Sequence, residues 1–148
     1  MRGSRNWQGR LADWLAGDTA VLSLPEAGVK DALPARLAEI GYEPVRVDFT
    51  AIADKDDLMA AMARALGLDA WFGANWDALG DALFGPEAPS ERAQVLVFDV
   101  PPSGPALDEV DFEMLLQIVR DVAGSGRSVL KGAIVVGGSP FRGGAEET

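Results

Sequence analysis

The chain has 148 residues, of which 48% are hydrophobic, a formal net charge of −10, and neither histidine nor cysteine. That length predicts one domain with a substantial core, the missing cysteine excludes disulfides and thiolate chemistry, and the missing histidine removes the commonest general base and metal ligand. No apolar run is long enough to span a membrane, the N-terminus lacks the apolar segment of a secretory signal, and the negative charge disfavours direct nucleic-acid binding. The charge favours a cationic partner, although it also serves solubility alone.

Helix and strand signals alternate along the first part of the chain. Pro34 interrupts one helical pattern, so that helix is expected either to start near Asp31 or to kink. Short apolar runs bounded by turn residues predict the strands, the first of them buried. The expected elements are a helix over 6–16, a strand over 19–24, a helix over 29–40, a strand over 45–50 and a helix over 54–66.

The same alternation continues to the C-terminus. Residues 93–100 carry the strongest strand signal, and their near-continuous apolar run indicates burial on both faces. A long amphipathic helix over 108–123 and a strand over 129–136 follow, and the Gly-rich stretch 137–148 predicts a flexible tail. This succession predicts an α/β fold in which about four mainly parallel strands are flanked by helices, within a single domain, 1–148.

A stretch in the middle of the chain combines residue choices that local rules do not explain. Trp71 and Phe72 place two large aromatics in a predicted loop, and Asn75 is a good helix N-cap. Asp77 and Asp81 lie four residues apart in the helix that follows, so their carboxylates leave the same side, at a cost of about 0.2–0.5 kcal/mol. Positions that break local rules without an evident gain are candidates for function.

The helix that begins at Asn75 has two different sides. Its core side consists of apolar residues at i, i+3 and i+7, namely Trp76, Leu79 and Leu83. Its other side carries Asp77, Gly80, Asp81 and Phe84. Because a mid-helix glycine costs about 1 kcal/mol relative to alanine, we expect Gly80 to serve a purpose, namely to let a partner approach the helix backbone between the two carboxylates.

This stretch resembles the signature of the barstar family, the intracellular protein inhibitors of barnase-type ribonucleases. The family pattern reads aromatic, aromatic, Gly, any residue, Asn, any residue, Asp, Ala, Leu, any residue, Asp, any residue, Leu. The positions that fit it in register are Trp71, Phe72, Gly73, Asn75, Asp77, Ala78, Leu79, Asp81 and Leu83. The similarity extends over about 45–136, and residues 116–121 resemble the late helix that places another acidic residue, here Asp121, at the inhibitor's binding face.

The resemblance implies a barstar-like fold, a small parallel sheet of three strands flanked by helices, for residues 43–136. A helix-strand-helix extension over 1–42 would pack on that sheet and add one strand. The chain departs from the pattern at two positions, because Gly80 stands where the best-known member has an aromatic residue and Ala74 where it has an acidic one. These departures bear on the identity of the target rather than on the fold.

The resemblance also implies a function. It points to a cytoplasmic, immunity-type inhibitor, with no enzymatic activity, cofactor or metal, that is monomeric when free and binds a basic ribonuclease. In the family, the positions of Asp77 and Asp81 insert carboxylates into the ribonuclease active site, where they take the place of RNA phosphates. The predicted partner-binding residues are Asp77, Asp81, Trp71, Phe72, Gly73, Asn75, Gly80, Phe84 and Asp121.

Several of these residues also have a structural interpretation. The helix dipole stabilises Asp77 near the helix start, and the capping role of Asn75 is sufficient on its own. The alternative for Trp71 is that its side chain folds back into the core. Asp121 lies near a helix C-terminus, where the dipole disfavours it, and the sequence is equally compatible with a partner contact and with a solvated position.

Two other classes of function stay open at this point. An acidic interaction or regulatory module with a non-nuclease partner would suit Gly80 and the N-terminal extension. A carboxylate hydrolase would use Asp77 and Asp81 as an acid–base pair or would hold Mg²⁺ between them with waters. The sequence contains no metal-ligand cluster, nucleophile elbow or phosphate-binding loop that would support an enzyme.

Overall fold

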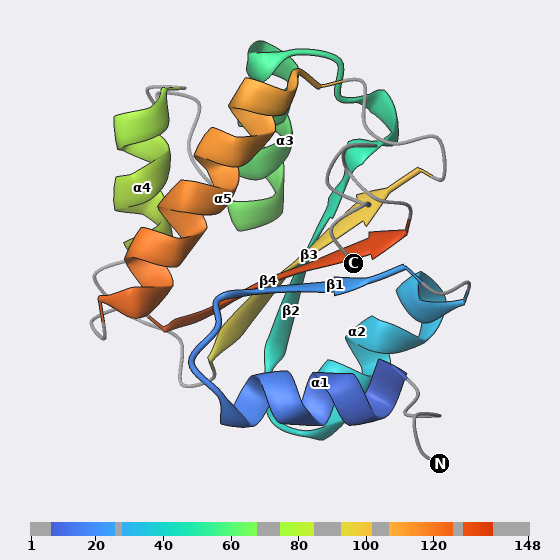
Figure 1. Cartoon of the computed structure of the whole chain (residues 1–148). Coiled ribbons are helices and arrows are strands. Elements are labelled where there is room, and N and C mark those ends of the chain that lie inside the picture. The colour runs from blue at the N-terminus through green and yellow to red at the C-terminus, as the bar shows by residue number, and fades with distance from the viewer. Residues whose placement is uncertain are drawn as a thin grey trace.

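A parallel sheet organises the molecule (Figure 1). The computed structural model describes residues 7–25, 28–67, 75–84, 93–101, 107–125 and 129–137, and for Phe84 the backbone alone. The strands are β1 (Val21–Leu24), β2 (Glu43–Asp48), β3 (Gln94–Val100) and β4 (Leu130–Gly137). They lie in the order β1-β4-β3-β2, and every neighbouring pair is parallel. The predicted α/β fold with four parallel strands is therefore confirmed.

The helices that the structure describes fall where the sequence predicts them. They are α1 (Trp7–Ala16), α2 (Val29–Glu39), α3 (Lys55–Leu66), α4 (Trp76–Phe84) and α5 (Glu109–Gly124). Side-chain oxygens of Asp54, Asn75 and Asp108 accept hydrogen bonds from backbone N–H groups in the first turns of α3, α4 and α5, at 2.8, 2.8 and 2.9 Å. These caps satisfy amides that the helix itself leaves unpaired.

The first strand differs from its prediction in its place in the sheet. The sequence predicts a buried strand over 19–24, but β1 is a four-residue edge strand in which only Leu24 is buried. The prediction of burial is wrong, because a short apolar run does not reveal the order of the strands. The helix-strand-helix unit before β2 does add a strand to the sheet, as predicted, because β1 pairs with β4.

Two further boundaries differ in detail. β2 ends at Asp48, not at Thr50, because Asp48 Oδ1 accepts a hydrogen bond from the Thr50 N–H at 2.9 Å and starts a short 3₁₀ helix, Phe49–Ala51. The second helix starts at Val29 and continues through Pro34, so the predicted start near Asp31 is not observed.

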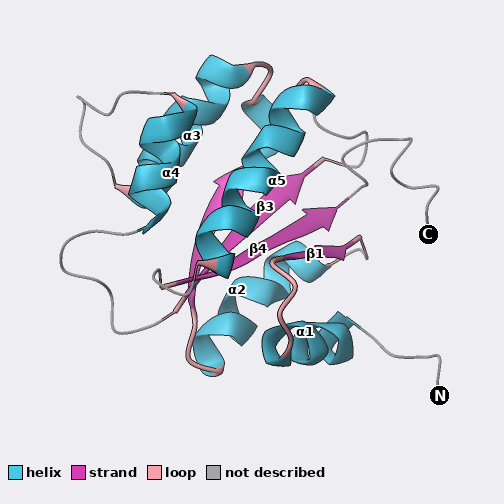
Figure 2. Ribbon diagram, turned by 60° about the vertical axis from the view of Figure 1, so that its left-hand side comes forward, coloured by secondary structure: helices cyan, strands magenta, loops and turns pink. Residues whose placement is uncertain are grey.

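Helices cover both faces of the sheet (Figures 1 and 2). α3, α4 and α5 pack on one face, where Phe49, Phe98 and Phe112 lie with ring centroids 5.3 to 6.5 Å apart. α1 and α2 pack on the other face over a smaller core. Successive β3 residues alternate between the two cores, so β3 is buried on both faces as predicted. No described helix is both long and apolar enough to cross a membrane.

Candidate protein-binding face

The candidate site begins with α4, which lies in the outer layer beside α3 and α5 (Figure 2). Leu79 and Leu83 are buried in the larger core, and Trp76 packs against it while half-exposed. The N-cap holds the start of the helix, because the Ala78 N–H donates to Asn75 Oδ1 at 2.8 Å. The predicted core side and the predicted capping residue are therefore present, and they fix the direction of the other side chains of α4.

Asp77 and Asp81 are both exposed on this helix. Within the described part of the chain, neither carboxylate forms an ion pair or a side-chain hydrogen bond. The two acids therefore do not turn inward to neutralise any cation among the described residues. They present two negative charges to solvent from a helix that is capped and packed, so little conformational freedom remains to be lost on binding.

Gly80 lies closer to the neighbouring helix than the sequence suggests. A Cβ atom at Gly80 would lie 3.8 Å from Ile118 Cγ2 of α5, which is ordinary contact, and the residue is half-buried. The expectation that Gly80 shares a fully outward side with Asp77 and Asp81 is therefore corrected, because this position borders the seam between α4 and α5. Asp77 precedes Gly80 by three residues, so its side chain leaves the helix next to that seam.

The second acidic helix contributes Asp121 from the last turns of α5. This residue is exposed, and the Gln117 Nε2 donates to its Oδ1 at 3.0 Å. Ile118, which faces Gly80, precedes Asp121 by three residues, so the two lie on adjacent parts of the α5 surface. The structure thus places Asp121 on α5, the helix that adjoins α4.

α5 also carries exposed apolar residues that are not among the predicted binding residues. Val110 is 73% exposed and Met114 is 42% exposed, and both precede Ile118 on α5 at spacings of four. They form a second apolar stripe, adjacent to the core stripe of the same helix. That spacing of four is the signal that would have found them.

The aromatic residues predicted to bind the partner lie largely outside the described part of the chain. Trp71, Phe72 and Gly73 lie outside the described residues, and of Phe84 only the backbone is described. Trp76 is the aromatic residue that the structure places at the start of α4, and Lys55 Nζ lies 5.9 Å from the centroid of its ring.

A second group of charged residues lies at the C-terminal ends of β2 and β3. The Arg46 Nη2 donates to Asp99 Oδ2 at 2.8 Å, and Asp99 is only 7% exposed. Beside this pair, the hydroxyl and the N–H of Thr50 lower the pKa of Asp48 below its ordinary value of 3.8. Among the described residues, no group of acids is arranged to hold a metal ion.

These features define a class of protein. A small parallel α/β fold presents an acidic, well-anchored helix whose charges have no partner in the described part of the chain, and this arrangement is suited to binding a basic protein. A family model described as "Barstar (barnase inhibitor)" matches residues 42–135, well over half of the chain. The chain therefore belongs to the barstar family, as its signature residues predict. The comparison with curated proteins returned no match.

The match leaves one part of the molecule outside the family region. It begins just before β2 and ends within β4, and so it includes the helices that carry Asp77, Asp81 and Asp121. α1, β1 and α2 precede it. The acidic face is thus built from the region that the family shares. The edge strand β1 lies outside that region.

Proposed function

We propose that this protein inhibits a basic ribonuclease by binding it through the acidic helix and loop at 71–85. The observation that carries the proposal is the state of Asp77 and Asp81, which are exposed and have no ion pair within the described residues. Membership of a family described by barnase inhibition supports a ribonuclease as the partner. In this proposal Asp81 forms the centre of the contact and Asp77 lies beside it.

Physical chemistry explains why such acids would block a nuclease. A ribonuclease cleft must attract phosphates, so it is lined by cations, and two helix-borne carboxylates would occupy the same positions. Their desolvation is repaid only where the partner supplies full pairing, which makes the contact selective. The net charge of −10 would also raise the rate of encounter with a basic protein at low salt.

The remaining predicted residues have supporting roles in this proposal. Asn75 sets the position of Asp77 by capping α4, and Asp121 adds a charge from α5. Trp71, Phe72 and Gly73 would form the packing rim, and Phe84 and Gly80 would border it. We further propose that the protein is a monomer when free, without catalytic activity, and that it acts in the cytoplasm, because a chain without cysteine suits a reducing compartment.

Inhibition of RNA cleavage tests the proposal directly. The purified chain would be titrated against barnase and against any basic ribonuclease encoded beside its gene, with cleavage of a fluorogenic RNA as the readout. We expect inhibition at a ratio near one to one. Asp81→Ala should weaken it at least thirtyfold, because truncation of a central interface residue costs at least about 2 kcal/mol.

A matched control is available on the opposite face of the sheet. Asp31 is an exposed acid in the first turn of α2, so Asp31→Ala removes the same charge far from α4. We expect it to change inhibition by less than about twofold, since only long-range attraction is lost. Equal inhibition by wild type and Asp81→Ala would show that the site is wrong, and inhibition of none of these ribonucleases would show that the function is wrong.

An acidic interaction module with a non-nuclease partner is the second candidate. Gly80 favours it, because the missing side chain at the seam with α5 leaves the acidic face without the bulky residue that the family's best-known member has there. Under this candidate, Asp81→Ala would abolish binding to a basic protein that does not cleave RNA.

A further inference from the structure

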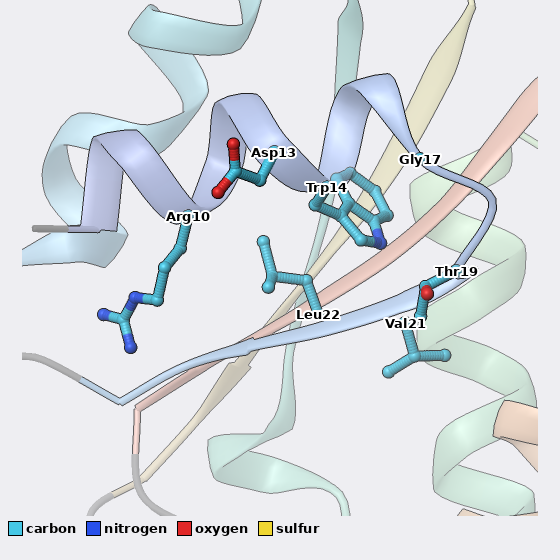
Figure 3. Close-up of a pocket in the computed structure, with 7 residues that line it drawn as sticks. All are labelled: Arg10, Asp13, Trp14, Gly17, Thr19, Val21 and Leu22. Carbon is cyan, nitrogen blue, oxygen red and sulfur yellow. The ribbon is translucent and has the colours of Figure 1, made fainter. Parts of the chain in front are cut away.

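A groove lies at the opposite end of the sheet from β2, between α1 and β1 (Figure 3). It is open on one side and has a volume of about 300 Å³. Arg10, Asp13 and Trp14 line it from the helix, and Val21 and Leu22 line it from the strand. Neither α1 nor β1 belongs to the region that the barstar family model matches. The groove is therefore a separate feature from the acidic face.

The lining residues show that the groove follows the outer edge of β1, which pairs with no other described strand. Leu22 packs against the core beneath α1 and α2, whereas Val21 packs against the core beneath α3, α4 and α5. Figure 3 shows Leu22 directed toward α1 and Val21 directed away from it. Since successive side chains of a strand point to opposite faces, a groove that touches both must pass along the edge of the strand.

The backbone of β1 offers hydrogen bonds along the same edge. The Ala133 N–H of β4 donates to the Ala20 carbonyl at 2.9 Å, so the peptide groups of Ala20 and Leu22 point toward β4. Because these groups alternate in direction along a strand, the N–H and C=O of Val21 and Ser23 point away from the sheet. An additional strand placed beside β1 would be able to form hydrogen bonds with the backbone groups of Val21 and Ser23.

The two edges of the sheet differ in their protection. The edge strand β2 contains Pro44 and the charged residues Glu43, Arg46 and Asp48. The segment 19–24 contains no charge and no proline. Natural proteins usually guard exposed edges with charges, proline or bulges, because an unguarded edge pairs with other chains. β1 therefore contains neither the proline nor the charged residues that protect the edge at β2.

The groove also contains a buried donor that has no acceptor among the described residues. Trp14 is only 5% exposed, and its Nε1 has no hydrogen-bond partner within the described part of the chain. Figure 3 shows the ring nitrogen turned toward β1. A buried N–H without an acceptor costs about 1–3 kcal/mol, so buried donors are seldom left unpaired. A ligand in the groove would supply the missing acceptor.

The position of this indole is firmly set by β4. Lys131 Nζ lies 5.2 Å from the centroid of the Trp14 ring and donates to the Gly17 carbonyl at 2.8 Å. Gly132 leaves room for the ring, because a Cβ atom there would lie 3.0 Å from Trp14 Cζ2 and 2.0 Å from the Ala20 oxygen. The donor is thus held in place before any ligand arrives.

We propose that this groove binds an extended peptide segment of a partner protein, which adds as a further strand to the outer edge of β1. Main-chain bonds to Val21 and Ser23 would supply affinity, an uncharged apolar side chain would pack against Trp14 and Leu22, and an acceptor of the peptide would pair with Trp14 Nε1. A second copy of this chain fits less well. Its own edge groups would be used by the new ladder and its other β1 carbonyls point to its own β4, so the backbone of its β1 would supply no acceptor for the indole.

Selection from a displayed library of random heptapeptides on the immobilised full chain tests this proposal. We expect enrichment of uncharged peptides that alternate apolar and polar residues. On titration with an enriched peptide, the amide signals of Val21 and Ser23 and the indole signal of Trp14 should shift in a ¹H–¹⁵N spectrum. Failure to enrich any peptide would overturn the proposal.

Two substitutions distinguish the addition of a strand to the edge of β1 from nonspecific apolar binding. Ser23→Pro removes an outward N–H without touching the bonds to β4 and should abolish binding. Trp14→Phe keeps an aromatic ring but removes the donor, and should weaken binding up to about tenfold, the usual effect of one hydrogen bond. Trp7→Phe is the matched control, since Trp7 lies on the same helix and the same core but does not line the groove, and it should leave affinity unchanged.

The remaining outcomes also decide the question. Circular dichroism and the amide spectrum establish that each variant is folded. Peptides that bind folded Ser23→Pro as tightly as wild type, or that bind only when Asp77 and Asp81 are present, would overturn the assignment to β1. Sedimentation that reveals a dimer, lost in Ser23→Pro, would assign the edge to a second copy and would likewise overturn it.

Discussion

The acids of α4 and the acids at the ends of β2 and β3 have the same chemistry and opposite surroundings. Asp77 and Asp81 are exposed and unpaired within the described residues, whereas Asp99 is 7% exposed and pairs with Arg46 at 2.8 Å. Asp48 is held by hydrogen bonds from its neighbour Thr50. The difference suggests a division of roles, because acids with internal partners stabilise the fold, whereas acids without them are left for another molecule. Five substitutions test that division.

Removal of Arg46 should have the largest effect on stability. Arg46→Ala leaves the carboxylate of Asp99 buried without its cation, and its other oxygen, Oδ1, already has no partner among the described residues. We expect a loss of about 2 kcal/mol, less than for a fully buried pair because the arginine side chain is half-exposed. Urea denaturation measures this loss, and an unchanged midpoint would contradict the assigned role of the pair.

Removal of the other partner should cost less. Asp99→Ala takes away the buried charge and leaves Arg46, whose side chain is 49% exposed, free to return to water. We expect a loss of about 1 kcal/mol, the net value of one good hydrogen bond. The informative result is which of the two variants loses more free energy of unfolding. If Asp99→Ala were more damaging than Arg46→Ala, burial of the carboxylate would not be the dominant cost.

Asp48 should make a smaller and pH-dependent contribution. Its folded pKa lies below the ordinary value of 3.8 because of Thr50, so its stabilisation is present above the unfolded pKa and is lost as pH falls through the folded pKa. Asp48→Ala should cost about 0.5 kcal/mol at neutral pH, the low end for a capping residue, because the side chain is largely exposed.

Thermal unfolding at several pH values checks this expectation. The melting temperatures of wild type and Asp48→Ala should differ at pH 7 and converge once the pH has fallen through the folded pKa of Asp48, where the carboxylate is protonated in both states. A difference that stays constant down to pH 2 would point to lost packing or backbone effects in place of the lost charge.

The acids of α4 should have the smallest effect on stability. Asp81→Ala removes a like-charge pair with Asp77 and should be neutral or stabilising by about 0.2–0.5 kcal/mol. Asp77→Ala removes an acid from the first turn and should cost about 0.3 kcal/mol through the helix dipole. Chemical denaturation of both variants, compared with Arg46→Ala, tests the division directly. A loss above about 1 kcal/mol in either would show that the α4 acids belong to the fold.

Much of the candidate site can be read from local sequence. The i, i+3, i+7 spacing identified the core side of α4 through Leu79 and Leu83, and the preference of asparagine for N-caps identified the start of the helix at Asn75. Those two features place Asp77 and Asp81 on the exposed side, where the structure has them. The family resemblance then supplied what periodicity does not, namely a reason for two acids to be there.

Tertiary structure decided the relations between elements. The Arg46–Asp99 pair joins residues 53 positions apart, and Gly80 faces Ile118 of another helix, so neither contact leaves a local trace. The edge position of β1 follows from the strand order β1-β4-β3-β2, which local patterns do not encode.

The sequence by itself determined the succession of helices and strands, their buried sides and the acidic character of α4, because each depends on residues a few positions apart. Only the tertiary structure decided which acids have partners among the described residues, which strands form the edges of the sheet and which groove the indole of Trp14 lines. Those properties depend on which distant segments become neighbours, and that choice is made by packing of the whole sheet and its two cores.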